Sequence, residues 1–98
     1  MTITSKREDK TLTLVVSGRL DTSTAPELQA VVETSLAGVS ALIFDFSDLA
    51  YISSAGLRVL LTAQKMLGDS GKITVKGANE TVRDVFAITG FDHFMNLE

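Results

Sequence analysis

The sequence predicts an α/β domain with a mostly parallel sheet, and three observations lead to this class. Short runs rich in β-branched and apolar residues occur at 11–17, 41–46 and 72–76, and each is typical of a β-strand. Between and after these runs, apolar residues recur at helical spacing. Strands that alternate with helices predict parallel neighbours joined by right-handed crossovers.

The N-terminal part predicts an antiparallel hairpin at the edge of this sheet. Residues 2–7 alternate weakly between polar and apolar side chains. The polar turn Glu8-Asp9-Lys10 joins them to the strand at 11–17, which stops at Gly18. A first strand connected by so short a turn is expected to pair with the second.

The first helix is expected to begin after Thr24. Thr24 and Glu27 have the spacing of a capping box, in which each side chain satisfies a free amide of the first turn. Pro26 fits because that turn needs no amide donor from it. Gly38 is expected to end the helix. The expected inner face comprises Leu28, Val31, Val32, Ser35 and Leu36.

The remaining elements follow from the same signals. The nearly continuous apolar run at 41–46 predicts a strand that is buried on both faces. A second helix is expected to end at Gly68 or Gly71, and a third helix to start at the cap residue Asn79 and close at Gly90. A final short strand is expected at 94–97. The expected inner faces of the two helices are Leu57, Leu60, Leu61, Gln64 and Leu67, then Val82, Val85, Phe86 and Ala87.

Composition narrows the possible functions. The 98 residues are expected to form one domain, 1–98, and lack cysteine, which excludes disulfides and thiolate chemistry. The single histidine, His93, cannot form a site with a second histidine. Nine basic and twelve acidic residues give a net charge of −3, which argues against nucleic-acid binding. No apolar run has the length of a membrane span or a signal segment, so we expect a cytoplasmic protein without membrane insertion.

The loop between the buried strand and the second helix is the main candidate for a functional site. In open α/β sheets, ligands and partners bind at loops that follow the carboxyl ends of strands. Ser53 and Ser54 stand just before the helix, and their spacing favours a simple N-cap by one of them. The alternative is a presented hydroxyl, and the two roles do not exclude each other because two serines are available. The small neighbours Ala55 and Gly56 leave that hydroxyl open. We expect a larger side chain at Gly56 to crowd the hydroxyl or a docked partner.

Enzymatic alternatives have weaker support. Ser54 lacks the Gly-x-Ser-x-Gly elbow and a marked base, so a serine hydrolase is disfavoured. Asp45 and Asp48 are interpreted as strand-end and turn carboxylates, and no metal or cofactor is expected. Residues 68–73 lack the spacing of a phosphate-binding loop. Arg58 is exposed by helical phase next to Ser54, where it is either simply solvated or meets an acidic partner or a phosphate.

Three segments resemble a known family. They are Gly18-Arg19-Leu20-Asp21, then Asp45-Phe46-Ser47, then Ile52-Ser53-Ser54-Ala55-Gly56-Leu57-Arg58-Val59-Leu60-Leu61. In order and spacing they resemble the STAS-domain anti-sigma factor antagonists over almost the whole chain. The resemblance implies a small α/β domain with an edge hairpin and a sheet flanked by helices. It implies no enzyme activity, and any ATP would belong to a partner.

The resemblance also implies a site and partners. With Gly56-Leu57 on the family's Gly-Leu, the phosphoacceptor falls on Ser54, and Ser53 is the alternative acceptor. The implied partner is an anti-sigma factor serine kinase, which the unphosphorylated protein binds to free a sigma factor. A serine/threonine phosphatase would reset the switch. The alternative function is an accessory subunit of a transporter, for example a lipid-handling ABC system. The expected partner-binding residues are Asp21, Thr22, Ser53, Ser54, Ala55, Gly56 and Arg58.

Overall fold

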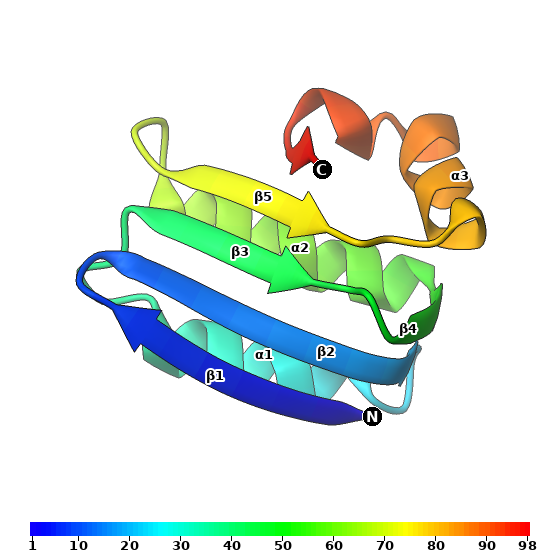
Figure 1. Ribbon diagram of the computed structural model, residues 1–98, viewed down its shortest axis with the longest axis horizontal. Helices are drawn as coiled ribbons and strands as arrows, with labels where there is room; N and C mark the ends of the chain where they lie inside the picture. The colour runs from blue at the N-terminus through cyan, green and yellow to red at the C-terminus, as the bar shows by residue number, and fades with distance from the viewer.

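Six strands and three α-helices form the computed structural model, which describes residues 1–98 (Figure 1). The strands are β1 (Thr2–Glu8), β2 (Thr11–Leu20), β3 (Ala41–Asp45), β4 (Leu49–Ile52), β5 (Lys72–Lys76) and β6 (Asn96–Leu97). The helices are α1 (Ala25–Ser35), α2 (Ser54–Leu67) and α3 (Glu80–Thr89), followed by the 3-10 turn η1 (Phe91–His93). No helix combines the length and hydrophobicity that a membrane crossing requires.

The sheet confirms the predicted α/β class. Its strand order is β1-β2-β3-β5-β6, and β4 pairs with β2 off this path. Only β1 is antiparallel to its neighbour, with Thr2 opposite Ser17 and Glu8 opposite Thr11. The other pairings are parallel. The predicted edge hairpin and mostly parallel sheet are therefore both present.

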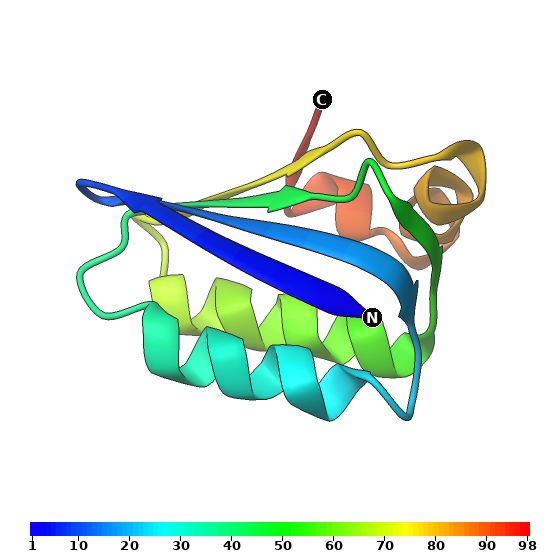
Figure 2. The same cartoon turned by 60° about the horizontal axis from the view of Figure 1, so that its bottom comes forward.

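The two long helices cover one face of the sheet only. Figure 2 shows α1 and α2 side by side beneath the strands. The crossovers from β2 to β3 and from β4 to β5 advance in the same direction along the sheet. Right-handed crossovers that advance in the same direction lie on the same face.

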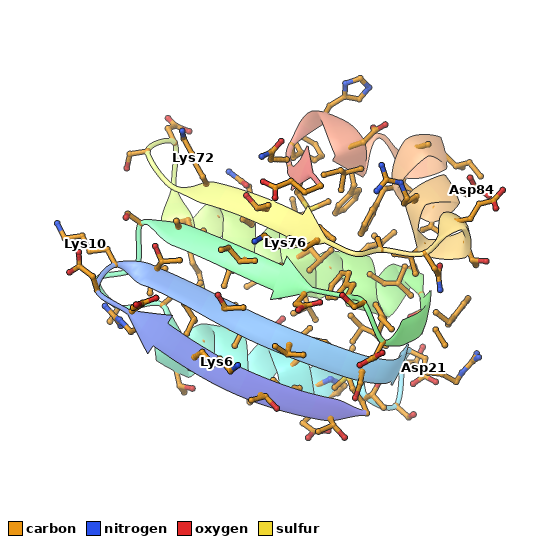
Figure 3. The ribbon with its side chains drawn as sticks, in the orientation of Figure 1. Lys6, Lys10, Asp21, Lys72, Lys76 and Asp84 are labelled. Carbon is orange, nitrogen blue, oxygen red and sulfur yellow. The ribbon has the colours of Figure 1, made fainter.

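The prediction that the 41–46 strand is buried on both faces is therefore wrong. Leu42 and Phe44 are fully buried under the helices, whereas Ile43 is half-buried on the opposite face. The uncovered face carries threonine and lysine side chains around the apolar ones. Figure 3 shows Lys6, Lys72 and Lys76 on the strands of this face.

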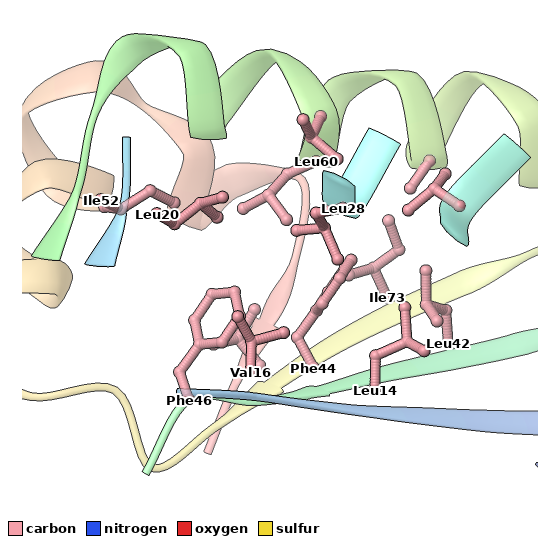
Figure 4. Packing of buried hydrophobic residues seen from close by; sticks show 14 of the residues in the cluster. Leu14, Val16, Leu20, Leu28, Leu42, Phe44, Phe46, Ile52, Leu60 and Ile73 are labelled. Carbon is pink, nitrogen blue, oxygen red and sulfur yellow. The ribbon is translucent and has the colours of Figure 1, made fainter. Parts of the chain in front are cut away.

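The core lies between the covered face of the sheet and the helices. It contains 22 buried hydrophobic residues and no buried charged or polar side chain. Figure 4 shows Leu28 of α1 and Leu60 of α2 above Leu14 and Phe44 of the sheet. Each such side chain stabilises the fold by about 1.5–3 kcal/mol when it is fully buried.

The inner faces of the helices differ from prediction by part of a turn. In α2, Leu61, Gln64 and Leu67 are only partly buried, and the buried residues are Gly56, Leu57, Val59, Leu60 and Ala63. In α3, Ala87 is exposed, and only Val82 and Phe86 are buried. The cause in α3 is its place beyond the end of the sheet, where one side alone contacts β4 (Figure 1).

The predicted caps Asn79, Gly68 and Gly90 are confirmed, whereas both predicted ends of α1 differ. The C-cap of α1 is Leu36, two residues before the predicted Gly38. Asn79 Oδ1 accepts a hydrogen bond from Val82 N at 2.8 Å, and Gly68, with φ +73°, is the C-cap of α2. Thr24 makes no side-chain cap, so the predicted capping box with Glu27 does not form. Thr24 Oγ1 instead donates to Arg19 O at 2.8 Å and accepts from Asp21 N at 2.9 Å, because it closes the turn before the helix.

Strand β4 is the element that the sequence pattern did not predict. β2 is ten residues long: Thr11–Val15 pair with β3, and Gly18–Leu20 pair with β4. Within the β2–β4 pairing the register shifts between Gly18 and Arg19, and Gly18 N donates to Asp48 O at 3.0 Å. Gly18 adopts φ +93°, a conformation that favours glycine. The chain thus leaves β3, turns, and returns to the sheet beside the end of β2.

Gly56 lets the first turn of α2 lie directly on the ends of these two strands. A Cβ atom at this position would lie 2.7 Å from Leu20 Cγ and 2.8 Å from Ile52 Cγ1. Both distances are shorter than carbon atoms tolerate. The core packing therefore requires glycine at this position. A side chain at Gly56 was expected to crowd the Ser54 hydroxyl or a docked partner, but it would collide with Leu20 and Ile52.

The one-sided cover of the sheet predicts unequal effects of two neighbouring truncations. Leu42→Ala should lower the free energy of unfolding by about 2–5 kcal/mol, because it leaves a cavity in the core. Ile43→Ala should cost only about 1 kcal/mol, mainly through lost strand preference. Urea denaturation measures both values. Equal losses would show that a second layer covers the other face.

The contact of Gly56 predicts the effect of adding one methyl group. Gly56→Ala should lower the free energy of unfolding by about 1–2 kcal/mol, although alanine alone favours a helix by about 1 kcal/mol. Ser54→Ala is the control, because Ser54 is exposed two residues away and should change stability by less than about 0.5 kcal/mol. Thermal unfolding compares the two variants. A Gly56→Ala protein as stable as the parent would contradict the packing described above.

Candidate functional site

The ends of β2 and β4 bring together the residues expected at the site. The backbone N–H of Ser53 donates to Leu20 O at 2.9 Å, so the ladder between the two strands continues to the start of α2. Asp21 follows β2 directly, and Ser54 follows Ser53. The β2–α1 loop and the serine pair therefore share one edge of the sheet. Figure 3 shows Asp21 at this edge.

The two serines differ in what their hydroxyl groups do. Ser53 has an extended backbone, and its Oγ accepts a long hydrogen bond from Gly56 N at 3.5 Å, as an N-cap does. Its side chain is half-buried. Ser54 is exposed in the first turn of α2, and its hydroxyl has no hydrogen-bond partner within the chain. One serine therefore caps the helix and the other presents a free hydroxyl.

Asp21 shapes the loop next to the serine pair. Its Oδ1 accepts hydrogen bonds from the amide and hydroxyl of Ser23, at 3.1 and 2.8 Å, and from Thr24. The Ser23 hydroxyl is the main reason that the pKa of Asp21 is lowered from its ordinary value. This carboxylate therefore holds the turn at 21–24, and Oδ2 is the oxygen left to face other groups.

Arg19 and Tyr51 extend the same edge, and neither was among the expected partner-binding residues. They are opposite each other in the β2–β4 pairing, and the Arg19 guanidinium lies 4.6 Å from the centre of the Tyr51 ring. Arg19 Nε also lies 3.9 Å from Asp21 Oδ2. The sequence pattern could not indicate that Arg19 and Tyr51 are neighbours, because it did not predict β4.

A hollow of about 280 Å³ separates the first turns of α1 and α2. Three of the expected partner-binding residues line it: Thr22, Ala55 and Arg58. The other lining residues are Ala25, Pro26, Gln29 and Val59. Arg58 is the one charged residue in this lining. Ser54 directly precedes Ala55 in α2 and does not itself line the hollow.

Of the seven expected partner-binding residues, only Gly56 is buried, against Leu20 and Ile52. The other six are at least partly accessible, and the side chains of Ser53 and Asp21 also accept hydrogen bonds from the neighbouring backbone. Gly56, Ser53 and Asp21 thus support the surface that the other four residues form.

The carboxylate at the end of β3 serves the turn into β4. Asp45 Oδ1 accepts hydrogen bonds from Ser47 Oγ at 2.6 Å and from Ser47 N at 3.0 Å. The Ser47 hydroxyl is the main cause that lowers the pKa of Asp45. Asp45 is therefore occupied within its own turn. His93 lies on η1 beyond α3, beside Asp92.

Comparisons with known proteins agree with this architecture. The family model of the STAS domain matches residues 2–98. BtrV of Bordetella bronchiseptica, which bears the name of an anti-sigma factor antagonist, is 33% identical over 93 residues, or 93% of this chain and 80% of BtrV.

Solved structures show the same fold. An anti-sigma factor antagonist from Mycobacterium paratuberculosis matches with a TM-score of 0.88 and 28% identity, over 98% of this chain and 83% of that chain. SpoIIAA of Bacillus in its phosphorylated form matches with a TM-score of 0.78 over 99% of this chain and 91% of that one, and at 21% identity it shows the fold alone. The resemblance found in the sequence segments is confirmed: the chain belongs to the STAS domain family, and its relatives bear the name of anti-sigma factor antagonists.

Proposed function

We propose that this protein is an anti-sigma factor antagonist whose partner binding is switched by phosphorylation of Ser54. The observation that carries the proposal is the exposed hydroxyl of Ser54, which makes no hydrogen bond within the chain and directly precedes Ala55 in the lining of the hollow between α1 and α2. The names of the relatives supply the class of function. Ser53 is the less suitable acceptor, because its hydroxyl caps the helix.

The partner in this proposal is an anti-sigma factor that is also a serine kinase. The unphosphorylated protein binds it through Thr22, Ser54, Ala55 and Arg58, and the bound anti-sigma factor releases its sigma factor. The kinase supplies ATP. A serine/threonine phosphatase removes the phosphate and returns the protein to its binding state.

A phosphate on Ser54 weakens this binding through charge. It adds about −1.5 to −2 charges and three acceptor oxygens to a surface that had a neutral hydroxyl. A partner surface that fits the hydroxyl has no group to compensate a buried dianion. A loss of about 1.4 kcal/mol is already a tenfold loss of affinity.

The fold accommodates the same phosphate without rearrangement. Ser54 lies outside the cluster of 22 buried hydrophobic residues, and its side chain is exposed. It is also in the first turn of α2, where the helix dipole favours a negative charge. The switch in this proposal therefore acts on the interface and leaves the sheet unchanged.

The position of the phosphate is the first test. Incubation with ATP and the cognate anti-sigma kinase should place one phosphate on Ser54, as read by phosphopeptide mass spectrometry. Ser54→Ala should abolish incorporation. Ser53→Ala is the control: it should remain a substrate and lose about 1 kcal/mol of stability with its cap. Phosphate on Ser53 alone would show that the acceptor is assigned one residue too late. No incorporation in the parent protein would favour a scaffold, such as a transporter subunit.

The mechanism of the switch is the second test. Ser54→Asp should bind the anti-sigma factor at least tenfold more weakly than the parent, as measured by calorimetry, while Ser54→Ala keeps the affinity. Amide resonances of both variants should change only around residues 51–60. Shifts that extend through the strands of the sheet would mean that the switch is conformational, and the interface mechanism would be abandoned.

A further inference from the structure

We propose that a phosphate on Ser54 captures the side chain of Arg58, so that phosphorylation removes a cation from the partner-binding surface as well as adding an anion to it. This inference rests on the proposed function, because it concerns the phosphorylated state of the same site. It assigns Arg58 a different role in each state: it faces the partner in one and pairs with the phosphate in the other.

The spacing on α2 places the two residues on one face. Ser54 and Arg58 are four residues apart in a helix that runs without interruption from Ser54 to Leu67. Residues at this spacing have Cβ atoms about 5–6 Å apart. Helical side chains lean toward the N-terminus, so the longer side chain of Arg58 extends toward Ser54 and not away from it.

Arg58 is also free to make this contact. Its side chain is exposed and forms no ion pair in the chain, and the residues that line the hollow with it are all uncharged. Guanidinium groups bind phosphate oxygens through two parallel hydrogen bonds, which are stronger than bonds between neutral groups.

The other charged groups at this end of the molecule make contacts of their own or lie outside the lining of the hollow. Arg19 contacts the Tyr51 ring and lies 3.9 Å from Asp21 Oδ2. Glu27 on α1 and Asp48 in the turn before β4 are exposed and do not line the hollow. The first turn of α2 contains no acidic residue that would compete for Arg58.

Lys65 provides a matched comparison on the same helix. It lies seven residues beyond Arg58, which is about 10 Å along the helix axis. Lys65 is exposed, as Arg58 is. Each side chain carries one positive charge, so Lys65→Gln and Arg58→Gln change the net charge by the same amount. Lys65→Gln therefore measures the effect of losing a distant positive charge, and Arg58→Gln that of losing one four residues from the phosphate.

The consequence for the switch is that two effects add. In the unphosphorylated protein, Arg58 can pair with an acidic group of the partner at the rim of the hollow. In the phosphorylated protein the same guanidinium is held by the protein's own phosphate. An acidic group of the partner is then repelled by the phosphate and no longer has the Arg58 guanidinium to pair with.

The test uses a full-length protein with phosphoserine installed at position 54 by genetic encoding, so that no kinase is needed. The probe is the second ionisation of the phosphate, which has an ordinary pKa of about 6, followed by ³¹P NMR at low ionic strength. A neighbouring cation favours the dianion and lowers this pKa. We expect the pKa to be higher by about 0.3 in Arg58→Gln than in the parent. Arg58→Lys should fall between them, and Lys65→Gln should match the parent.

An unchanged phosphate pKa in Arg58→Gln would overturn the inference. Equal shifts in Arg58→Gln and Lys65→Gln would also overturn it, because they would indicate a general field in place of a contact. Circular dichroism of each variant confirms that α2 is retained. Since the phosphate is installed directly, this result is independent of the kinase assay: failure of that assay removes the proposed function, and failure of this titration removes only the role of Arg58.

Discussion

The pairing of β4 with the end of β2 is the contact on which the rest of the site depends. β2 is long enough to pair with β3 over its first half and with β4 over its last residues. Because Ser53 N still donates to Leu20 O, α2 begins at a defined distance from the β2–α1 loop. The turn around Asp45 and Ser47 makes this return possible, and Gly18 adopts the conformation needed where the partner strand changes.

The site combines a rigid support with an accessible surface. Gly56 is pressed against Leu20 and Ile52, Ser53 caps α2, and Asp21 holds the turn before α1. These groups can influence partner binding without contacting the partner, because they help to determine the positions of Ser54 and Arg58. A substitution in this support can therefore weaken binding without contacting the partner, which is why stability must be measured beside affinity for every variant at this edge.

A switch of this kind suits a domain of 98 residues. The core contains no buried polar or charged residue, so no buried hydrogen bond or ion pair between core side chains is available to be rearranged by a switch. In the proposed mechanism, the phosphate acts outside that core, on a surface whose one unpaired cation is Arg58. Local charge then changes the affinity for a partner, and the sheet and the packing of α1 and α2 remain as they are.

The sequence by itself determined the α/β class, the edge hairpin, the three helices, and the Ser53-Ser54 pair at the start of α2, because periodicity, caps and glycine stops are local signals. It misplaced what depends on distant neighbours. The apolar run at 41–46 resembles a strand buried on both faces, but both long crossovers lie on the same side, and this leaves Ile43 half-exposed. β4 contains only four residues, Leu49–Ile52, which are too few to show the alternation of polar and apolar side chains that predicts a strand. Only the tertiary structure could decide that this strand pairs with β2, and with it that Arg19 meets Tyr51 and that Gly56 faces the core, because those contacts join segments about thirty residues apart in the chain.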